Sequence, residues 1–337
     1  MRYYSSPSEL GEKWNSCLQR ARQTYFSSPE WHQVILELYH DTWLTKLTTK
    51  IHYFSIEKGG KAVLGFFGVK KWKGKKVLEL SPLLGPSDYY DFVSGPDTGP
   101  DTMQELMKNI ASDHKAAQIN FAHVKADSHL GTAIQCFSQV QVTKLDCVAI
   151  HLPESYESYF SALSKSVRQN IRTAYNRLRK DGQEAEFRLY TKAEINRIDF
   201  AALKDMYTSR NAYRKEKYGW KTRTFKFLNH PFSREKDMFE LDSIKSTDFS
   251  LGILKIKGET AAYFFGFERN GSIEINRVVI NHEHRFYSPG LLLLNEYIKN
   301  GIPEGLRIVD LTVGDEKYKF DLGGKVHQII SGSILLS

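Results

Sequence analysis

The feature that most constrains the fold is the order of short apolar-rich runs between residues 249 and 319. Three strand-like runs follow one another closely, and Asn270-Gly271 separates the last two. This pair is the strongest short hairpin signal, because a type I′ turn needs positive φ at both central residues. A turn, an apolar helix-like stretch and a fourth strand-like run come next. In chain order the expected elements are Phe249–Ile256, Thr260–Glu268, Ser272–Ile280, the turn His284–Gly290, the helix Leu291–Lys299 and the strand Arg307–Val313.

The turn before the expected helix has the composition of an anion site. The start of a helix gathers unpaired main-chain N–H groups and the positive end of the helix dipole. Pro289 gives up an N–H near this start, and Gly290 lets another group approach the main chain closely. The pattern therefore suits a phosphate or pyrophosphate, and it equally suits an ordinary connection from strand to helix.

A resemblance favours the first interpretation. Arg285-x-x-Ser288-x-Gly290 resembles a degenerate form of the Arg/Gln-x-x-Gly-x-Gly/Ala pyrophosphate loop of the GNAT acyltransferase superfamily, with Ser288 in place of the first glycine. The resemblance implies that the strand before the turn splays from its neighbour and that its main chain holds the pantetheine arm of acyl-CoA. It implicates the following donor-binding residues: Val278, Val279, Ile280, Arg285, Phe286, Tyr287, Ser288, Pro289 and Gly290.

The first half of the chain repeats the theme of meander, helix and strand. Its runs Ile51–Glu57, Lys61–Lys70 and Lys76–Leu80 predict a meander, followed by a helix near Thr102–Asp113 and a strand Ala117–Phe121. A length of 337 residues also favours about two domains. We therefore expect an α/β fold with a mixed sheet in tandem GNAT-like modules, 1–150 and 151–337, of which the second binds the donor.

The segment Ser155–Gly182 has the apolar spacing of one helical face, with Ser155 as its cap and Gly182 as its left-handed end. Arg168 and Arg172 project together on another face of this helix. They are either a solvated stripe or a clamp for phosphate or carboxylate, which the fork geometry of arginine suits.

The same segment is similar to the one that opens the C-terminal module of FemAB-like proteins of the GNAT superfamily, particularly the branch called cellulose-biosynthesis CelD/BcsL-type acetyltransferases. The pattern Ser-Lys/Arg-x-x-Arg-x-x-Ile/Leu-Arg of that branch is met by Ser164 or Ser166, Arg168, Ile171 and Arg172. Further pieces occur in the same order over about residues 25–325, namely Ser28-Pro29-x-Trp31, Asp88-Tyr89-x-Asp91, Tyr287-Ser288-Pro289-Gly290 and Gly314-x-x-x-Tyr318-Lys319.

Direct transfer to an amine needs a proton acceptor and a donor for the oxyanion. Glu274 and Asn276 share one face of their strand by the period of two. Glu274 is a candidate base, directly or through water, or else an exposed strand carboxylate. Asp310, between Val309 and Leu311, is either a second candidate for proton transfer or a structural partner of an arginine.

Three further residues are candidates for the site, and Tyr287 has a second candidate role. In the resembled family a Tyr-Lys pair borders the cofactor cleft, which implicates Tyr318 in substrate binding and Lys319 in contact with phosphate. Tyr213, in the expected helix Phe200–Tyr218, is a candidate for acceptor recognition. Tyr287 lies beside the donor turn and either lines the acceptor side or packs.

Composition excludes several other classes. No apolar run approaches the roughly 20 residues of a membrane span, and the first residues lack the apolar core of a secretion signal. Three widely spaced cysteines suggest a reducing compartment, so the cytoplasm is expected. Two histidines in His282-Glu283-His284 without further ligands do not predict a metal site. The net charge of +8 and the lysine-rich segment 70–76 are weak signals for nucleic acid, and a solvated hairpin tip explains the segment better.

These inferences converge on an acyl-CoA-dependent N-acyltransferase, with acetyl-CoA the favoured donor and an amine on a sugar or envelope-polysaccharide precursor the expected acceptor. Two alternatives stay open. One is a FemX-like transferase that takes an amino acid from aminoacyl-tRNA, and the other is a non-catalytic binding module that kept the fold.

Overall fold

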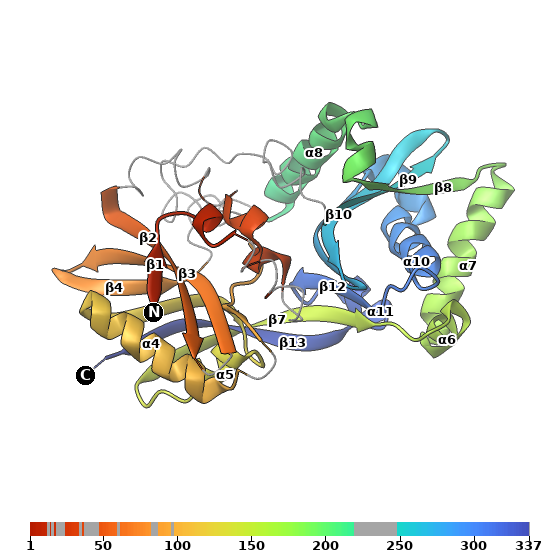
Figure 1. Cartoon of the computed structure of the whole chain (residues 1–337). Helices are drawn as coiled ribbons and strands as arrows, with labels where there is room; N and C mark the ends of the chain where they lie inside the picture. Colours follow the sequence, from red (N-terminus) through yellow and green to blue (C-terminus); the bar gives the residue numbers. More distant parts are fainter. Residues whose placement is uncertain are drawn as a thin grey trace. The chain divides into compact units, whose positions relative to one another are not determined.

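The computed structural model describes residues 1–337 except 12–13, 15–16, 18–23, 34–35, 37–46, 59–60, 82–86, 96–97, 219–247 and 337. The chain divides into two compact units (Figure 1). Unit 1 comprises Met1–Cys147 together with His327–Ser337, and unit 2 comprises Val148–Val326. The last segment of the chain therefore belongs to the first unit. Among the helices of the described part, none has the length and apolar character needed to cross a membrane.

Unit 1 is built on a sheet in the order β1-β2-β3-β4-β6-β13. The strands β2, β3 and β4 form the predicted antiparallel meander, and β4 pairs with β6 in parallel. Lys73 and Gly74 both have positive φ, which confirms that the lysine-rich segment is a tight hairpin tip. The elements are β1 (Arg2–Tyr4), β2 (Thr49–Lys58), β3 (Lys61–Trp72), β4 (Lys75–Leu80), β5 (Val93–Ser94), α4 (Pro100–His114), β6 (Ala116–Lys125), α5 (His129–Gln135), β7 (Val140–His151) and β13 (Lys325–Leu335).

Unit 2 has the same succession of antiparallel meander, helix and parallel strand. Its sheet has the order β12-β11-β10-β9-β8. Its meander, β9 (Phe249–Ile256), β10 (Glu259–Arg269) and β11 (Ser272–Ile280), agrees closely with the predicted strands. Asn270 and Gly271 have φ of 52° and 71°, which confirms the predicted type I′ hairpin. The helix α10 (Pro289–Gly301) then leads to β12 (Ile308–Val313), which runs parallel to β11.

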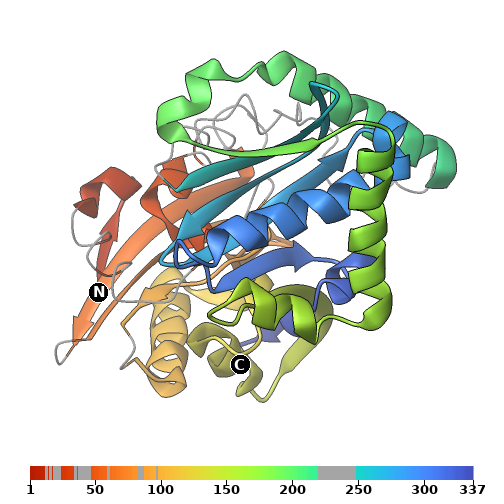
Figure 2. The ribbon, with the colours of Figure 1, turned by 90° about the vertical axis from the view of Figure 1, so that its right-hand side faces the viewer.

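Helices cover both faces of the unit 2 sheet. On one face α10 and α7 (Lys165–Lys180) pack against β9, β10 and β11 in a core that includes Leu254, Phe264, Leu293 and Ile298 (Figure 2). On the other face the Tyr263 hydroxyl donates to the carbonyl of Leu203 in α8 (Phe200–Tyr218) at 2.9 Å. Figure 1 shows α8 and α10 on opposite sides of β10.

One helix prediction needs correction. The segment from Ser155 to Gly182 forms two helices, α6 (Tyr156–Ala162) and α7, where the apolar spacing indicated one. Leu163 is extended at ψ 151°, and the Ser164 side chain accepts from the Val167 amide at 3.3 Å, so a new N-cap starts inside the periodic pattern. Gly182, at φ +61°, ends α7 as predicted.

Candidate active site

The candidate site lies where β11 and β12 part. The two strands pair in parallel at Ser272↔Ile308, Ile273↔Val309 and Glu274↔Asp310, and the described pairing stops there. Beyond this point β11 continues for six residues along β10 only, to Ile280. Among the described residues, no strand therefore pairs with the β12-facing edge of β11 from Asn276 onward, which is the splayed geometry that the resemblance implies.

A backbone irregularity on β12 ends the pairing. Thr312 has φ +55°, a left-handed conformation that is a genuine outlier for a β-branched residue, and its side chain is buried. Its amide donates to Asp310 Oδ1 at 2.9 Å, and its hydroxyl donates to the carbonyl of Ile275 at 3.2 Å. A side chain thus replaces the next ladder bond, and β12 turns away from β11.

Lys319 stabilises the diverging end of β12. Its ammonium group donates to the carbonyls of Leu311, Thr312, Val313 and Gly314 at 2.8–3.2 Å and lies 3.1 Å from Glu316 Oε2. The residue is only 2% exposed. Because buried carbonyls need partners, this ammonium group takes over the hydrogen bonds that a neighbouring strand would have supplied.

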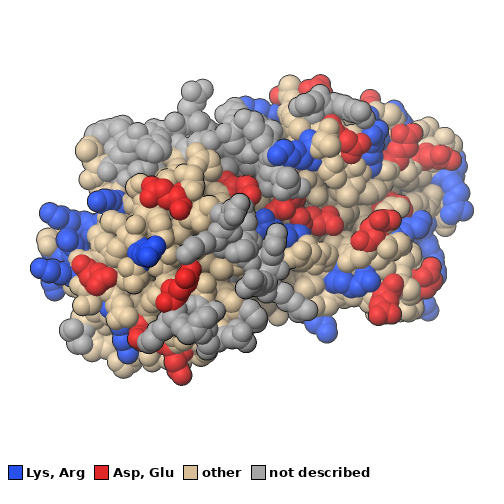
Figure 3. Space-filling view, in the orientation of Figure 1, with Lys and Arg blue, Asp and Glu red and all other residues tan. Residues whose placement is uncertain are grey.

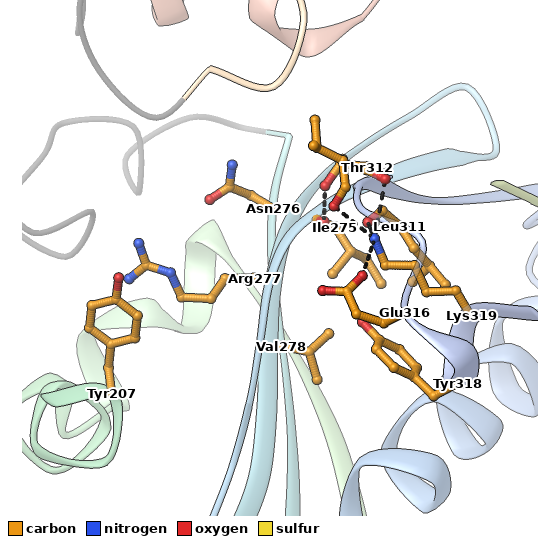
Figure 4. A pocket seen from close by; sticks show the side chains of 11 residues that line it. Tyr207, Ile275, Asn276, Arg277, Val278, Leu311, Thr312, Glu316, Tyr318 and Lys319 are labelled. Atoms are coloured by element: carbon orange, nitrogen blue, oxygen red, sulfur yellow. Dashed lines mark hydrogen bonds and ion pairs between the residues drawn. The ribbon is translucent and has the colours of Figure 1, made fainter. Parts of the chain in front are cut away.

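A second irregularity lies on β11, just beyond its last pair with β12. The register with β10 jumps from Phe265↔Arg277 to Gly266↔Ile275, so Asn276 is an extra residue in a β-bulge. Gly266 permits the bulge, since a Cβ there would be 2.5 Å from the carbonyl oxygen of Glu274. As a result Asn276 and Arg277 point to the same side of the strand (Figure 4), whereas strict alternation would place them on opposite faces.

A cavity of about 240 Å³ occupies the gap. On the side of α8 its wall is formed by Asn276, Arg277 and Tyr207, and on the other side by Thr312, Glu316 and Tyr318 (Figure 4). Glu316 begins the short helix α11 (Lys317–Asp321) as its N-cap residue. The complete lining is Tyr207, Ile275, Asn276, Arg277, Val278, Leu311, Thr312, Val313, Glu316, Tyr318 and Lys319.

The predicted donor turn begins as a 3₁₀-helix, His282–Tyr287, ahead of α10. Ser288 is left-handed at φ 51°, and its amide donates to the carbonyl of Arg285. Leu291 and Leu292 donate to the carbonyl of Ser288, and proline has no N–H. Gly290 is therefore the residue of this first turn whose amide can face a ligand, fewer main-chain donors than the resemblance implies.

The side chains of the turn separate into two groups. Arg285 and Phe286 are exposed, so their side chains are accessible to a ligand in solution. Tyr287 is buried, and its hydroxyl donates to Asp181 Oδ2 at 2.6 Å, which raises the pKa of Tyr287. Arg177 donates to the carbonyl of Phe286 at 2.7 Å and lies 4.5 Å from the centre of its ring. The C-terminal end of α7 thus holds the turn in place.

Four predicted donor residues remain to be placed. Val278 lines the cavity, and Ile280 packs against the core beneath α10. Val279 is fully buried on the opposite face. Lys319 lines the cavity, but its ammonium group is engaged with main-chain carbonyls, so its geometry favours shaping the cleft over contact with a phosphate.

The predicted proton acceptors lie below the cavity. Glu274 and Asp310 are the last pair in register before the strands part, and they are 7% and 4% exposed. Neither is part of the cavity lining, so proton transfer to them would need a relay. Glu316, with a side chain 53% exposed, is the carboxylate that the cavity contains.

The predicted arginine clamp is not part of this cavity. Arg168 Nη1 donates to the carbonyl of Ser161 at 2.8 Å, and the Arg172 guanidinium lies 5.6 Å from the centre of the Phe160 ring. Both side chains therefore connect α7 to α6. The side chain of Tyr213 lies outside the described residues. His284, buried, pairs with Glu259 at 3.2 Å, and no cluster suited to a metal occurs in the described part of the chain.

Sequence reasoning missed Tyr207, Arg277, Thr312 and Glu316. The signal for Arg277 is Gly266, since a glycine inside a strand pattern marks a bulge or a close main-chain approach. Nothing in the sequence signals the left-handed Thr312, because that conformation depends on its hydrogen bonds to Asp310 and, on β11, to Ile275.

Unit 1 contains the same irregularity, but its gap is filled. The pairing of β4 with β6 ends at Leu80↔Phe121, and His123, two residues later, has φ +59°. Tyr90 bridges to Val124, its amide donates to the carbonyl of His123 at 2.9 Å, and its hydroxyl donates to the carbonyl of Phe66. In unit 2 the corresponding spacing runs from Asp310 to Thr312, and there the gap is open.

An antiparallel meander, a turn, a helix and a parallel strand that parts from the meander together define an acyltransferase fold of the GNAT type, and this chain contains the series twice. Residues 165–320 match the family model described as "Acetyltransferase (GNAT) domain". No curated protein matches the sequence.

Solved structures agree on the fold. FemX is similar with a TM-score of 0.60 at 9% identity, covering 98% of this chain and 97% of that one. A conserved protein of unknown function from Bacteroides thetaiotaomicron VPI-5482 gives 0.57 at 12% identity, covering 98% and 99%. The C-terminal domain of a putative lysylphosphatidylglycerol synthetase from Agrobacterium fabrum gives 0.55 at 11% identity, covering 98% and 92%.

Proposed function

We propose that the protein is an N-acyltransferase that takes an acyl group from acyl-CoA, with acetyl-CoA the favoured donor, and transfers it directly to an amine. The observation that carries the proposal is the parting of β11 from β12, which places a cavity beside the strand that leads into the turn before α10. The match of residues 165–320 to an acetyltransferase domain supports it. The first unit, whose gap is closed by Tyr90, would not bind the donor.

The reaction follows from the groups around the cavity. The amine nitrogen attacks the thioester carbonyl carbon, the carbon–sulfur bond breaks, and the thiol of CoA leaves with a proton. A base accepts the single proton that the amine nitrogen loses in forming the amide, and this is the proton with which the thiol leaves. Glu316 in the cavity wall is the nearest carboxylate for this role, and Glu274 or Asp310 beneath it would act through water. Asn276 and Tyr318 carry the polar groups that would position the acceptor.

The acceptor that we favour is an amino group on a sugar or an envelope-polysaccharide precursor. The basis is the likeness, in order, of the motifs between Ser28 and Lys319 to the CelD/BcsL-type acetyltransferases.

A second candidate is transfer of an amino acid from aminoacyl-tRNA. The similarity to FemX over nearly the whole of both chains favours it, as does the fold shared with a putative lysylphosphatidylglycerol synthetase.

Thermal unfolding with and without acetyl-CoA separates the two candidates. With acetyl-CoA at 100 times its dissociation constant, we expect the melting temperature to rise by roughly 5–10 °C. Arg285→Glu should abolish the rise, since it places a negative charge beside the donor phosphates, whereas Lys299→Glu, at the far end of α10, should not. No shift in the native protein, together with protection by charged tRNA, would replace the first proposal by the second.

A further inference from the structure

The wall of the cavity beneath α8 contains a guanidinium group that the proposed chemistry does not use. Arg277 lies with its guanidinium carbon 3.7 Å from the centre of the Tyr207 ring and 5.2 Å from that of Phe265 (Figure 4). Both distances are within the range of a cation–π contact. Its position results from the bulge at Asn276, which turns Arg277 toward α8 at the level of the cavity.

Arg277 and the donor turn lie on opposite faces of the sheet. Val278 and Ile280 pack against the core that contains α10, whereas Arg277 pairs in register with Phe265 on the face that α8 covers. A donor held at the start of α10 therefore approaches the gap from one face. The acceptor has to approach from the other face, which is the face of Arg277.

We propose that Arg277 binds an anionic group, a carboxylate or a phosphate, on the amine acceptor. A guanidinium has five N–H donors in a fixed fork, so it can hold an oxyanion in addition to partners within the chain. Its place in the cavity lining brings this fork within reach of a ligand in the cavity. This inference deepens the proposed function and depends on it only for the transfer step, since binding of the acceptor does not require a donor.

The opposite wall carries the complementary charge. Glu316 lines the cavity across from Arg277, with a half-exposed carboxylate that is 3.1 Å from Lys319. A carboxylate on one wall and a guanidinium on the other suit a molecule with both an ammonium and an anionic group. An acceptor of this kind would be oriented with its amine toward Glu316 and the acyl donor.

Matched pairs of amines test the proposal, one with and one without the anionic group. Glucosamine 6-phosphate with glucosamine probes a phosphate, and serine with serinamide probes a carboxylate. Thiol release from acetyl-CoA gives kcat/KM for each amine, and the shift in melting temperature gives binding without a donor. We expect the native enzyme to prefer the anionic member of one pair, and Arg277→Gln to reduce kcat/KM for that member by roughly 10- to 100-fold.

Matched variants exclude a general loss of structure. Arg188 also stacks on a tyrosine, Tyr190 at 4.8 Å, but it lies on β8 outside the cavity, so Arg188→Gln should retain the preference. If Arg277→Gln does not fold, Arg277→Lys, which keeps the charge and loses the fork, should fold and lose most of the preference.

The outcomes separate the two proposals. Equal kcat/KM for both members of both pairs would overturn the assignment of Arg277 while leaving the transferase proposal standing. If Arg277→Gln abolished the rise in melting temperature with acetyl-CoA, this assignment would also be overturned, because Arg277 would then contribute to donor binding. If acetyl-CoA had no effect on the native protein, acetyl-CoA would be refuted as the donor. The melting-temperature shifts with the amines alone would still decide whether Arg277 selects anionic amines.

Discussion

At the scale of single residues, the candidate site depends on two side chains that act on the main chain. Thr312 uses its hydroxyl to replace a ladder bond to Ile275, and Lys319 uses its ammonium group to satisfy the carbonyls of a strand end that has left its partner. Neither role needs a ligand. Both hold open a gap that a regular parallel pair would close.

Replacing Lys319 should therefore destabilise the protein. Lys319→Met leaves two buried and two part-buried carbonyls without their donor, and we expect the free energy of unfolding to fall by about 2–4 kcal/mol. Lys317→Met is the matched control, since that side chain is 85% exposed and pairs with Asp321 one turn away, and its effect should stay below about 0.5 kcal/mol. Urea unfolding measures both, and equal effects would contradict the assigned role of Lys319.

A buried histidine in unit 1 should make stability depend on pH. His32 is 1% exposed, and burial lowers its pKa from 6.5 to about 3. Between these two pKa values the unfolded chain binds a proton that the folded chain does not. The contribution of neutral His32 to stability is therefore fully present above pH 6.5 and is lost as the pH falls toward 3.

The variant His32→Phe keeps an aromatic ring against Phe66 and Trp14 and removes this proton. We expect the loss of stability with falling pH to lessen by up to about 1.4 kcal/mol per pH unit inside the window. The measurement is urea unfolding at several pH values, and parallel pH profiles for the native protein and the variant would contradict the expectation.

At the scale of secondary-structure elements, small local signals decide where strands and helices stop. The bulge at Asn276 sets two neighbouring side chains on one face of β11, and the extended Leu163 separates α6 from α7. Arg177 in α7 and Asp181, the C-cap residue of this helix, contact the turn before α10, so the start of α7 affects the position of the turn.

The cap at the start of α7 gives a direct test. Ser164→Ala removes the acceptor for the Val167 amide, and we expect a loss of about 1 kcal/mol in stability. Ser164→Asp keeps a good cap and should stay close to the native value. Thermal unfolding of the three proteins decides, and a native-like Ser164→Ala would indicate that α6 and α7 behave as one continuous helix.

At the scale of the whole molecule, the chain uses one arrangement twice with different outcomes. Each unit has a meander, a helix and a parallel strand with a left-handed residue two positions after the last pair. In unit 1 Tyr90 fills the resulting gap, and in unit 2 the gap is a cavity. On the face of the molecule drawn in Figure 3, acidic and basic side chains are interspersed over the described part of each unit.

The division of the chain predicts the effect of removing its last segment. The strand β13 pairs with β6 and buries Ile329, Ile330 and Ile334 in unit 1. Deleting residues 327–337 should therefore increase hydrogen exchange in β6 while leaving β9, β10 and β11 protected. Equal loss of protection in both units, or none, would contradict the assignment of this segment to unit 1.

The sequence by itself determined the meander of the second module, because its hairpin depends on local chemistry. Asn270-Gly271 selects its turn through positive φ, and the alternating apolar runs on either side set the register. It also located the turn before α10 and the strand that leads into it.

Only the tertiary structure decided what the site contains. The Lys319 ammonium group binds the end of β12, where four main-chain carbonyls accept hydrogen bonds from it. Arg277 faces the cavity because of a bulge opposite Gly266. Arg168 and Arg172, which share a helical face, contact α6 and not the cavity. These outcomes depend on contacts between segments far apart in the chain, and periodicity along one segment carries no information about them.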